Sequence, residues 1–306
     1  MDQRPRVVFM GSPEFAVPSL RGLAEICEIV GVVTQPDKPA GRGMKLTPPA
    51  VKIVATELGI PLIQPRSLKE ECAFNQLREW SPDLIVVVAF GQLLRKNVLD
   101  LPRFGCLNVH ASLLPAYRGA APIQAALLNG DQKTGVTIMR MDEGLDTGPI
   151  IFAAELPISP DETAGTLSVK LSRLGAETLL EILPDFLTGK LKPKAQPAQG
   201  TSYFGMIRKE DGQLLTNLDV ILAERKIRAF NPWPGASLQI GDETIKIHQA
   251  HIISGNPLPG SREIRDGYPA LGFKGGWLSL TNLQPAGRKA MDGKAFLAGK
   301  RDWVNG

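Results

Sequence analysis

The sequence predicts an α/β protein in which a doubly wound, mostly parallel sheet is followed by a small β-barrel domain. Two observations predict the first domain. Strand-like and helix-like patterns alternate along residues 5–100, and the run at 83–89, DLIVVVA, is almost continuously apolar. Strands that are apolar on both faces are typical of parallel sheets covered by helices on each side. A third observation predicts the second domain, because short alternating strands separated by turns begin near residue 237.

The first half of the chain is expected to start with a repeated alternation of strand and helix. The expected elements are a strand at 6–10, a helix at 13–26, a strand at 28–34, a helix at 50–58, a strand at 61–64, a helix at 68–80 and a strand at 83–89. In open sheets of this class, a ligand binds beyond the carboxyl ends of the central strands.

The stretch FGCLNVHASLLPAYRGAAPIQ, residues 104–124, is expected to be a short strand followed by a loop. Side chains two apart on a strand share a face, so Asn108 and His110 project together while Leu107 and Val109 face apolar packing. An amide donor beside a titratable imidazole suits attack of an amine on a carbonyl carbon, which creates an oxyanion and releases a proton. The alternative is that Asn108 only ends the strand and His110 is a structural histidine.

A third candidate group lies in GVTIMRMDEGLDTGPII, residues 135–151. The segment begins as an apolar strand and becomes a glycine-flanked loop that carries Asp142, Glu143 and Asp146. A carboxylate next to His110 would stabilise its positive charge and could take up a proton. Taken alone, each acid also fits a solvated turn.

These motifs together resemble the folate-dependent formyltransferases. The resemblance rests on HASLLPAYRGAAPIQ at 110–124, preceded by Asn108 and followed by DEGLDTGPI at 142–150. The segments VVFMGSPEFAVPSL at 7–20 and VVTQPDKPAGRGMKLTPP at 32–49 are similar to the members that act on methionyl-tRNA. The resemblance implies a Rossmann-like formyltransferase domain and an OB-like barrel. It also implies 10-formyltetrahydrofolate as co-substrate, no metal, and formyl transfer to methionine on the initiator tRNA.

The resemblance also implies roles for individual residues. The catalytic group would be Asn108, His110 and Asp146. The folate-binding residues would be Phe90, Gln92, Leu93, Ser112, Leu113, Leu114, Pro115, Met139 and Asp142. The cationic loop at 35–49 would contact the tRNA acceptor stem through Arg42, with Lys38 and Lys45 beside it. The candidates in the C-terminal domain are Lys209, Arg225, Arg228, Lys246, Arg288 and Lys289.

The expected division is a catalytic domain at 1–188, a linker at 189–204 rich in Lys, Pro and Gly, and a tRNA-binding domain at 205–306. Residues 1–200 hold 21 Lys and Arg against 21 Asp and Glu, whereas residues 201–306 hold 14 against 10, so the net charge of +4 lies in the C-terminal third. A basic domain suggests a polyanionic partner. An ordinary basic surface is the alternative.

Other classes of function are disfavoured. GSPEFA after the first strand has one glycine where a dinucleotide-binding fingerprint needs three. An apolar run of eighteen residues and an export signal are both lacking, and Cys27, Cys72 and Cys106 suit free thiols, so we expect a cytoplasmic protein. A monomer is expected, although no pattern in the sequence determines the oligomeric state. Three dispersed histidines suggest no metal cluster. The competing functions are formyl transfer to a small amine, such as a nucleotide or an amino-sugar, and RNA binding without catalysis.

Overall fold

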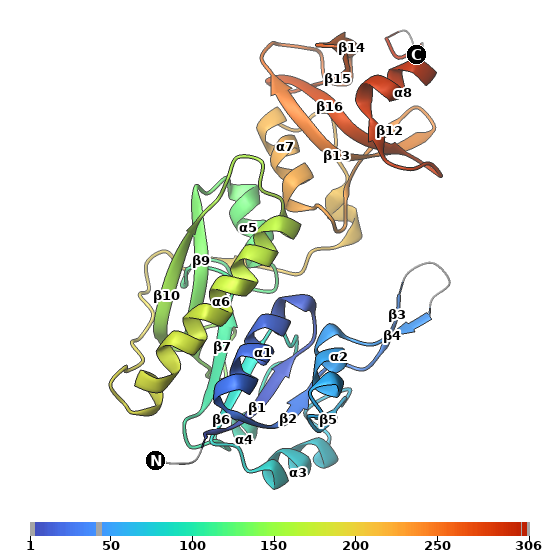
Figure 1. Ribbon diagram of the computed structural model, residues 1–306. Helices are drawn as coiled ribbons and strands as arrows, with labels where there is room; N and C mark the ends of the chain where they lie inside the picture. The colour runs from blue at the N-terminus through green and yellow to red at the C-terminus, as the bar shows by residue number, and fades with distance from the viewer. Residues whose placement is uncertain (1–3, 41–44, 301, 305–306) are drawn as a thin grey trace. The chain divides into compact units, whose positions relative to one another are not determined.

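The computed structural model describes residues 4–40, 45–300 and 302–304 (Figure 1). The chain divides into two compact units by its contacts. The first comprises Met1–Pro122, Lys133–Pro157 and Ser168–Phe204, and the second comprises Ile123–Gln132, Ile158–Leu167 and Gly205–Gly306. The helices of the described residues include none that is both long enough and apolar enough to cross a bilayer.

The first unit is built on a seven-stranded sheet in the order β10-β9-β7-β6-β1-β2-β5. The strands are β1 Arg6–Gly11, β2 Glu28–Val33, β5 Leu62–Ile63, β6 Leu84–Val88, β7 Cys106–His110, β9 Lys133–Arg140 and β10 Ile150–Pro157. The five strands from β5 to β7 are parallel, and β9 is antiparallel to both of its neighbours. The expected mostly parallel sheet is therefore confirmed.

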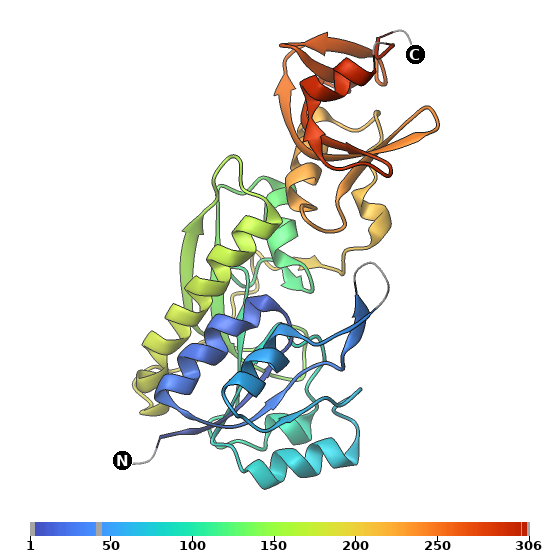
Figure 2. The same cartoon turned by 45° about the vertical axis from the view of Figure 1, so that its right-hand side comes forward.

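Helices cover both faces of this sheet. Successive side chains of a strand point to opposite faces, and in the central strands both sets are apolar and need to be buried. In β1, Val7 and Phe9 pack with helices α1 Val17–Ile26, α2 Ala50–Glu57 and α6 Ala164–Leu187. Val8 and Met10 pack on the other face, with α3 Glu71–Trp80 and α4 Lys96–Leu99. Figures 1 and 2 show α1 and α6 side by side on one face. A 3-10 turn, η1 Glu14–Ala16, precedes α1.

Two local expectations need correction. The helix expected to begin at residue 68 begins at Glu71, because Glu70 has an extended backbone (φ −67°, ψ 127°) that cannot belong to a helix; the Leu68 backbone N–H before it donates to the Gln92 side chain, 3.0 Å away. The loop at 35–49 contains a two-stranded hairpin, β3 Lys38–Ala40 and β4 Lys45–Thr47, in which Lys38 pairs with Thr47 and Pro39 with Leu46.

The segment predicted as a linker returns to the first unit. Its last residues form β11 Tyr203–Phe204, which pairs in parallel with β8 Arg118–Gly119. Lys194 exchanges two backbone hydrogen bonds of 2.7 Å with Ile150 at the start of β10. The boundaries of functional domains at 188 and 204 stay a prediction, but the intervening chain is held by hydrogen bonds.

The second unit is an antiparallel sheet in the order β12-β13-β16-β15-β14, with β17 on β16. Its elements are η2 Lys209–Gly212, α7 Val220–Ala229, β12 Ala236–Ile240, β13 Glu243–Ile253, β14 Arg262–Arg265, β15 Tyr268–Phe273, β16 Gly276–Pro285, β17 Met291–Asp292 and α8 Gly293–Gly299; most of α5 Pro122–Asn129 also belongs to it. Alternate residues of β13 and β16, such as Ile245, Ile247, Leu278 and Leu280, form its core with α7. The expected second domain of short β-strands is confirmed, and the structure shows that these strands are antiparallel.

Candidate active site

Strand β7 delivers Asn108 and His110 to one face of the sheet. Leu107 and Val109 are buried in the core on the opposite face, as the strand period predicts. His110 lies opposite Thr137 of β9, and Asn108 lies opposite Met139. The His110 side chain is 6% exposed, whereas Asn108 is half-buried. The two side chains therefore stand together near the carboxyl end of β7.

Both ring nitrogens of His110 face oxygen atoms. Nε2 lies 3.0 Å from the carbonyl oxygen of Tyr117, and since a carbonyl only accepts, Nε2 carries a proton and donates it. Nδ1 lies 3.8 Å from Oδ2 of Asp146. That separation is longer than a hydrogen bond. The ring is thus fixed through Nε2, and Nδ1 is the nitrogen directed toward the carboxylate.

Asp146 is held in place by its own backbone and by a neighbouring loop. Its φ is +54°, an uncommon conformation for a residue with a side chain. Its Oδ2 accepts a hydrogen bond of 2.8 Å from the Gly119 N–H. Gly148, two residues later, has no room for a Cβ, which would collide with the Arg140 carbonyl. The predicted association of His110 with Asp146 is present in the structure.

The loop after β7 is locked by Thr137, which the sequence reasoning missed. The fully buried Thr137 hydroxyl donates to the Ser112 carbonyl at 2.7 Å and accepts from the Leu114 N–H at 3.0 Å. The Ser112 hydroxyl donates to the Ala116 carbonyl at 2.6 Å. The available signal was a threonine between two apolar residues of a strand, on the face that carries His110. Ser112 thus organises the loop that presents Leu113, Leu114 and Pro115.

The other predicted folate residues lie in different environments. Phe90 and Met139 are buried in the core. The Asp142 side chain accepts hydrogen bonds from the Gly144 N–H at 3.0 Å and the Thr147 hydroxyl at 2.6 Å, so it shapes the loop that carries Asp146. Leu93 is 66% exposed. Gln92 is tied to the backbone of the segment at 66–68.

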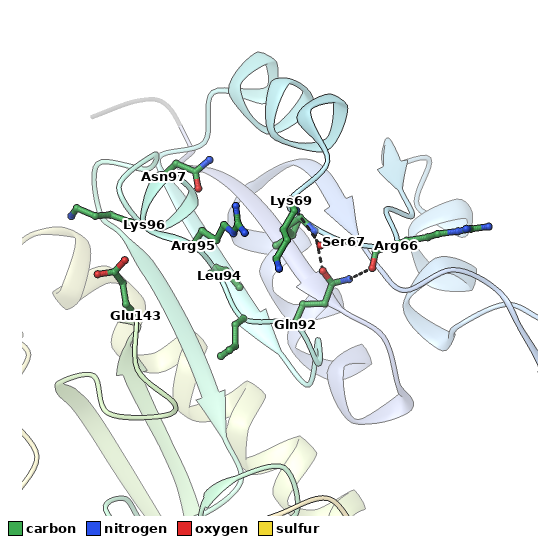
Figure 3. Close-up of a pocket in the computed structure, with 11 residues that line it drawn as sticks. Arg66, Ser67, Lys69, Gln92, Leu94, Arg95, Lys96, Asn97 and Glu143 are labelled. Atoms are coloured by element: carbon green, nitrogen blue, oxygen red, sulfur yellow. Dashed lines mark hydrogen bonds between the residues drawn. The ribbon is translucent and has the colours of Figure 1, made fainter.

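A cavity of about 730 Å³ adjoins two of these residues, Gln92 and Leu93 (Figure 3). Its lining is made by Arg66, Ser67, Leu68, Lys69, Gln92, Leu93, Leu94, Arg95, Lys96, Asn97 and Glu143. Four of these side chains are cationic and one is anionic, so the cavity is suited to an anionic ligand. The catalytic group predicted from the sequence is separate from this set of described lining residues.

The cationic hairpin is only partly described. Lys38 and Lys45 are exposed, and the Lys38 ammonium donates to the Gln35 side chain at 2.6 Å. Gln35 in turn donates to the Phe90 carbonyl at 2.9 Å. Arg42 lies outside the described residues. Because Gln64 and then Lys52 donate to its carboxylate, Asp37 at the base of the hairpin has a lowered pKa.

The basic candidates of the second unit differ in availability. Lys209, Lys246, Arg288 and Lys289 are exposed. Arg225 donates to the Asn129 carbonyl at 2.9 Å. Arg228 forms an ion pair of 2.5 Å with Glu224, where both side chains are less than one-fifth exposed. Lys209, Lys246, Arg288 and Lys289 are therefore better placed for a polyanion than Arg225 or Arg228.

Cys106 lies close to the site but is not suited to act as a nucleophile. Burial raises the pKa of its thiol to about 12, so the reactive thiolate is not populated near neutral pH. The described part of the chain contains no group of three or more His, Cys, Asp or Glu side chains placed to bind a metal ion.

Comparison with known proteins places both units with formyltransferases. The family model for formyl transferase matches residues 6–183, and the model for the formyl transferase C-terminal domain matches residues 206–301. The chain is 46% identical over 300 residues to a methionyl-tRNA formyltransferase of Myxococcus xanthus, covering 97% of this chain and 96% of the relative. It is 48% identical over 305 residues to that of Halorhodospira halophila, with 97% and 96% covered.

A solved structure shows the same fold at lower identity. WlaRD, a sugar 3N-formyl transferase solved in the presence of dTDP and 5-N-formyl-THF, superposes with a TM-score of 0.68 and 21% identity, covering 94% of this chain and all of that one.

Proposed function

The chain belongs to the methionyl-tRNA formyltransferase family, and on that premise we propose that Asn108, His110 and Asp146 carry out its chemistry. The enzyme transfers a formyl group to the α-amine of methionine on the initiator tRNA. The observation that supports the proposal is the placement of His110, with Nε2 on the Tyr117 carbonyl and Nδ1 3.8 Å from the Asp146 carboxylate.

The proposed reaction is an addition followed by an elimination. The α-nitrogen of methionine forms a bond to the formyl carbon of 10-formyltetrahydrofolate, and the formyl oxygen becomes an oxyanion. Asn108 donates its amide N–H to that oxyanion. The bond from the formyl carbon to N10 then breaks, and the proton released by the α-nitrogen replaces the formyl group on N10. The products are formylmethionyl-tRNA and tetrahydrofolate.

His110 is proposed to stabilise the oxyanion, and Asp146 is proposed to transfer the proton. Because Tyr117 holds Nε2, the second donor to the oxyanion is Nδ1–H of the protonated ring. The distance of 3.8 Å from Nδ1 to Asp146 exceeds a hydrogen bond, so Nδ1–H is available to the oxyanion while the nearby carboxylate stabilises the positive charge of the ring. Asp146 also accepts the proton from the α-nitrogen and passes it toward N10.

The folate co-substrate is proposed to occupy the face that carries Leu93 and the loop at 112–115, with its glutamate end in the 730 Å³ cavity. A folate carries two carboxylates at that end, and Arg66, Lys69, Arg95 and Lys96 supply complementary charge. A sugar formyltransferase of the same fold was solved with a formylated folate, which supports folate as the donor class.

The tRNA is proposed to contact the hairpin that carries Lys38 and Lys45, with Arg42 between them, and to contact Lys209. Full-length similarity at 46–48% identity to methionyl-tRNA formyltransferases disfavours a small amine as the acceptor. The presence of the formyl transferase domain likewise disfavours RNA binding without catalysis. We further propose that the enzyme acts as a monomer in the cytoplasm.

A formylation assay with three acceptors tests this proposal. The enzyme and 10-formyltetrahydrofolate are mixed with methionyl initiator tRNA, methionyl elongator tRNA or free methionine, and the initial rates are compared. Formylation of the initiator at a rate at least about a hundred times that of the other two is expected. Equal rates with the initiator and free methionine would contradict the proposed tRNA contacts.

A further inference from the structure

The segment at 194–204 is bound to three parts of the active site. Lys194 pairs with Ile150 just after the acidic loop. The Ser202 hydroxyl accepts from the Tyr117 N–H at 2.8 Å, and Tyr117 is the residue whose carbonyl holds His110. Tyr203 and Phe204 form β11, which pairs in parallel with Arg118 and Gly119 of β8. A segment that sequence composition marks as a linker is therefore part of the scaffold around the catalytic group.

Gln196 is the centre of this scaffold. Its side-chain Nε2 donates to the Asp146 carbonyl at 2.8 Å and to the Gly148 carbonyl at 2.7 Å. Its Oε1 accepts from the Arg118 guanidinium at 2.7 Å and 3.2 Å. The two carbonyls can only accept and the guanidinium can only donate, so the partners fix the orientation of the amide.

These bonds join the two pieces of chain that aim the Asp146 carboxylate. One piece is the loop of Asp146 itself, whose φ of +54° has to be maintained by surrounding contacts. The other is β8, where Arg118 precedes the Gly119 N–H that donates to Asp146 Oδ2 at 2.8 Å. Arg118 is buried and has a further partner in the Tyr203 hydroxyl, 3.0 Å away. Gln196 therefore sets the distance between the loop and the donor.

We propose that Gln196 is a positioning residue for Asp146, acting through its hydrogen bonds to the Asp146 and Gly148 carbonyls. This inference rests on the proposed catalytic role of Asp146. Only a side chain with two donors and an acceptor on one planar group satisfies all three partners. Glutamate keeps the acceptor but cannot donate to the carbonyls, and leucine can do neither.

The test is a double-mutant cycle between Gln196→Leu and Asp146→Asn, measured as the single-turnover rate of formyl transfer to methionyl initiator tRNA with enzyme in excess. In the wild-type background, Gln196→Leu is expected to lower the rate about 10- to 100-fold, because small misplacements of a reacting group are costly. In the Asp146→Asn background, the same change is expected to alter the rate less than about twofold. The KM for the folate should stay within about twofold.

Gln199→Leu is the matched control, because Gln199 is exposed in the same segment; it should leave the rate unchanged. Gln196→Glu should lose as much activity as Gln196→Leu, and full activity in that variant would overturn the inference. An equal loss from Gln196→Leu in both backgrounds, or no loss in either, would also overturn it. If Asp146→Asn alone kept the wild-type rate, the catalytic role of Asp146 would fail as well, and that result is distinct from a failure of Gln196 alone.

Discussion

At the scale of single residues, the site is defined by pairs of polar groups that fix one another. His110 is held by the Tyr117 carbonyl, Asp146 by the Gly119 N–H, and the loop at 112–116 by Thr137. Removing one partner of such a buried hydrogen bond lowers the free energy of unfolding by more than the bond itself contributes, because the other partner stays buried and unpaired. Substitution of the residues that hold the proposed catalytic group should therefore have measurable effects, as substitution of the group itself should.

Thr137→Val keeps the shape of the side chain and removes both of its hydrogen bonds. We expect the free energy of unfolding to fall by about 1–3 kcal/mol, because the Ser112 carbonyl and the Leu114 N–H lose a buried partner. The KM for the folate should rise as the loop at 112–116 loosens. Chemical denaturation and initial-rate kinetics measure the two effects.

Thr56→Val is the control for this change, since the Thr56 hydroxyl bonds to its own helix at an exposed position; a change below about 0.5 kcal/mol is expected there. Equal losses of stability in the two variants would show that Thr137 has no special structural role.

The three cysteines should differ sharply in reactivity. Cys72 is exposed, whereas burial raises the pKa of the Cys27 thiol to about 11 and that of Cys106 to about 12. Since the thiolate is the reactive form, a thiol reagent at pH 8 should label one cysteine rapidly in the folded protein and three after denaturation. Cys72→Ser should remove the rapid phase. A rapid phase that persists in this variant would contradict the described burial.

At the scale of helices and strands, the period-two pattern was sufficient to predict most of the first sheet. The apolar run of β6 predicted a strand buried on both faces, residues 6–10 were correctly expected to form a strand, and the alternation in β7 predicted that Asn108 and His110 share a face. Helix ends were less predictable. Helix α3 begins three residues later than expected because Glu70 has an extended backbone, and the Leu68 N–H before it donates to Gln92, 24 residues away.

The contacts that complete the site could not be read from local patterns. Gly119 donates to Asp146 across 27 residues, Thr137 bonds to Ser112 across 25, and Gln196 reaches Asp146 across 50. Hydrophobic period and turn chemistry report on neighbours in sequence, so they carry no signal for such pairs. The resemblance to formyltransferases supplied His110 and Asp146 as a pair, but it did not supply the residues that aim them.

Substitution of Gly135 in β9 tests how closely the strands and the loop around the site are packed. A Cβ at this position would collide with the Ala154 carbonyl of β10 and would lie 2.6 Å from Leu113. Gly135→Ala is therefore expected to destabilise the protein by about 1–3 kcal/mol, through displacement of β10 or of the loop that carries Leu113. The midpoint of urea unfolding measures the loss.

Gly299→Ala at the end of α8 is the matched control for this change, because open space surrounds its Cβ position. A loss of stability as large in that variant would argue against a specific clash at Gly135.

At the scale of the whole molecule, the net positive charge and the proposed catalytic residues lie in different stretches of the chain. The proposed catalytic group belongs to the first unit, whereas the excess of Lys and Arg lies in residues 201–306. Binding of a tRNA through such a surface releases counterions, so the affinity should fall as salt rises. The rate of the chemical step depends on short hydrogen bonds and should therefore change less with salt concentration than the affinity for tRNA does.

Lys209→Ala should lower the slope of log affinity for tRNA against log salt concentration by about 0.7–0.9, the change expected for one lost phosphate contact. Lys300→Ala is the control, because Lys300 is paired with Glu243 at 3.0 Å. Fluorescence titration at several salt concentrations gives both slopes. An unchanged slope in Lys209→Ala would remove this residue from the proposed tRNA contacts.

The most direct measurement of the central claim is the single-turnover rate of formyl transfer to methionyl initiator tRNA by Asn108→Ala. We predict a rate about 100- to 1000-fold below that of the wild type, with unchanged thermal stability, because one oxyanion donor is lost. Asn75→Ala, on the exposed side of α3, should transfer at the wild-type rate. A rate for Asn108→Ala within about threefold of the wild type would contradict the proposed role of the Asn108 side chain as a hydrogen-bond donor to the oxyanion.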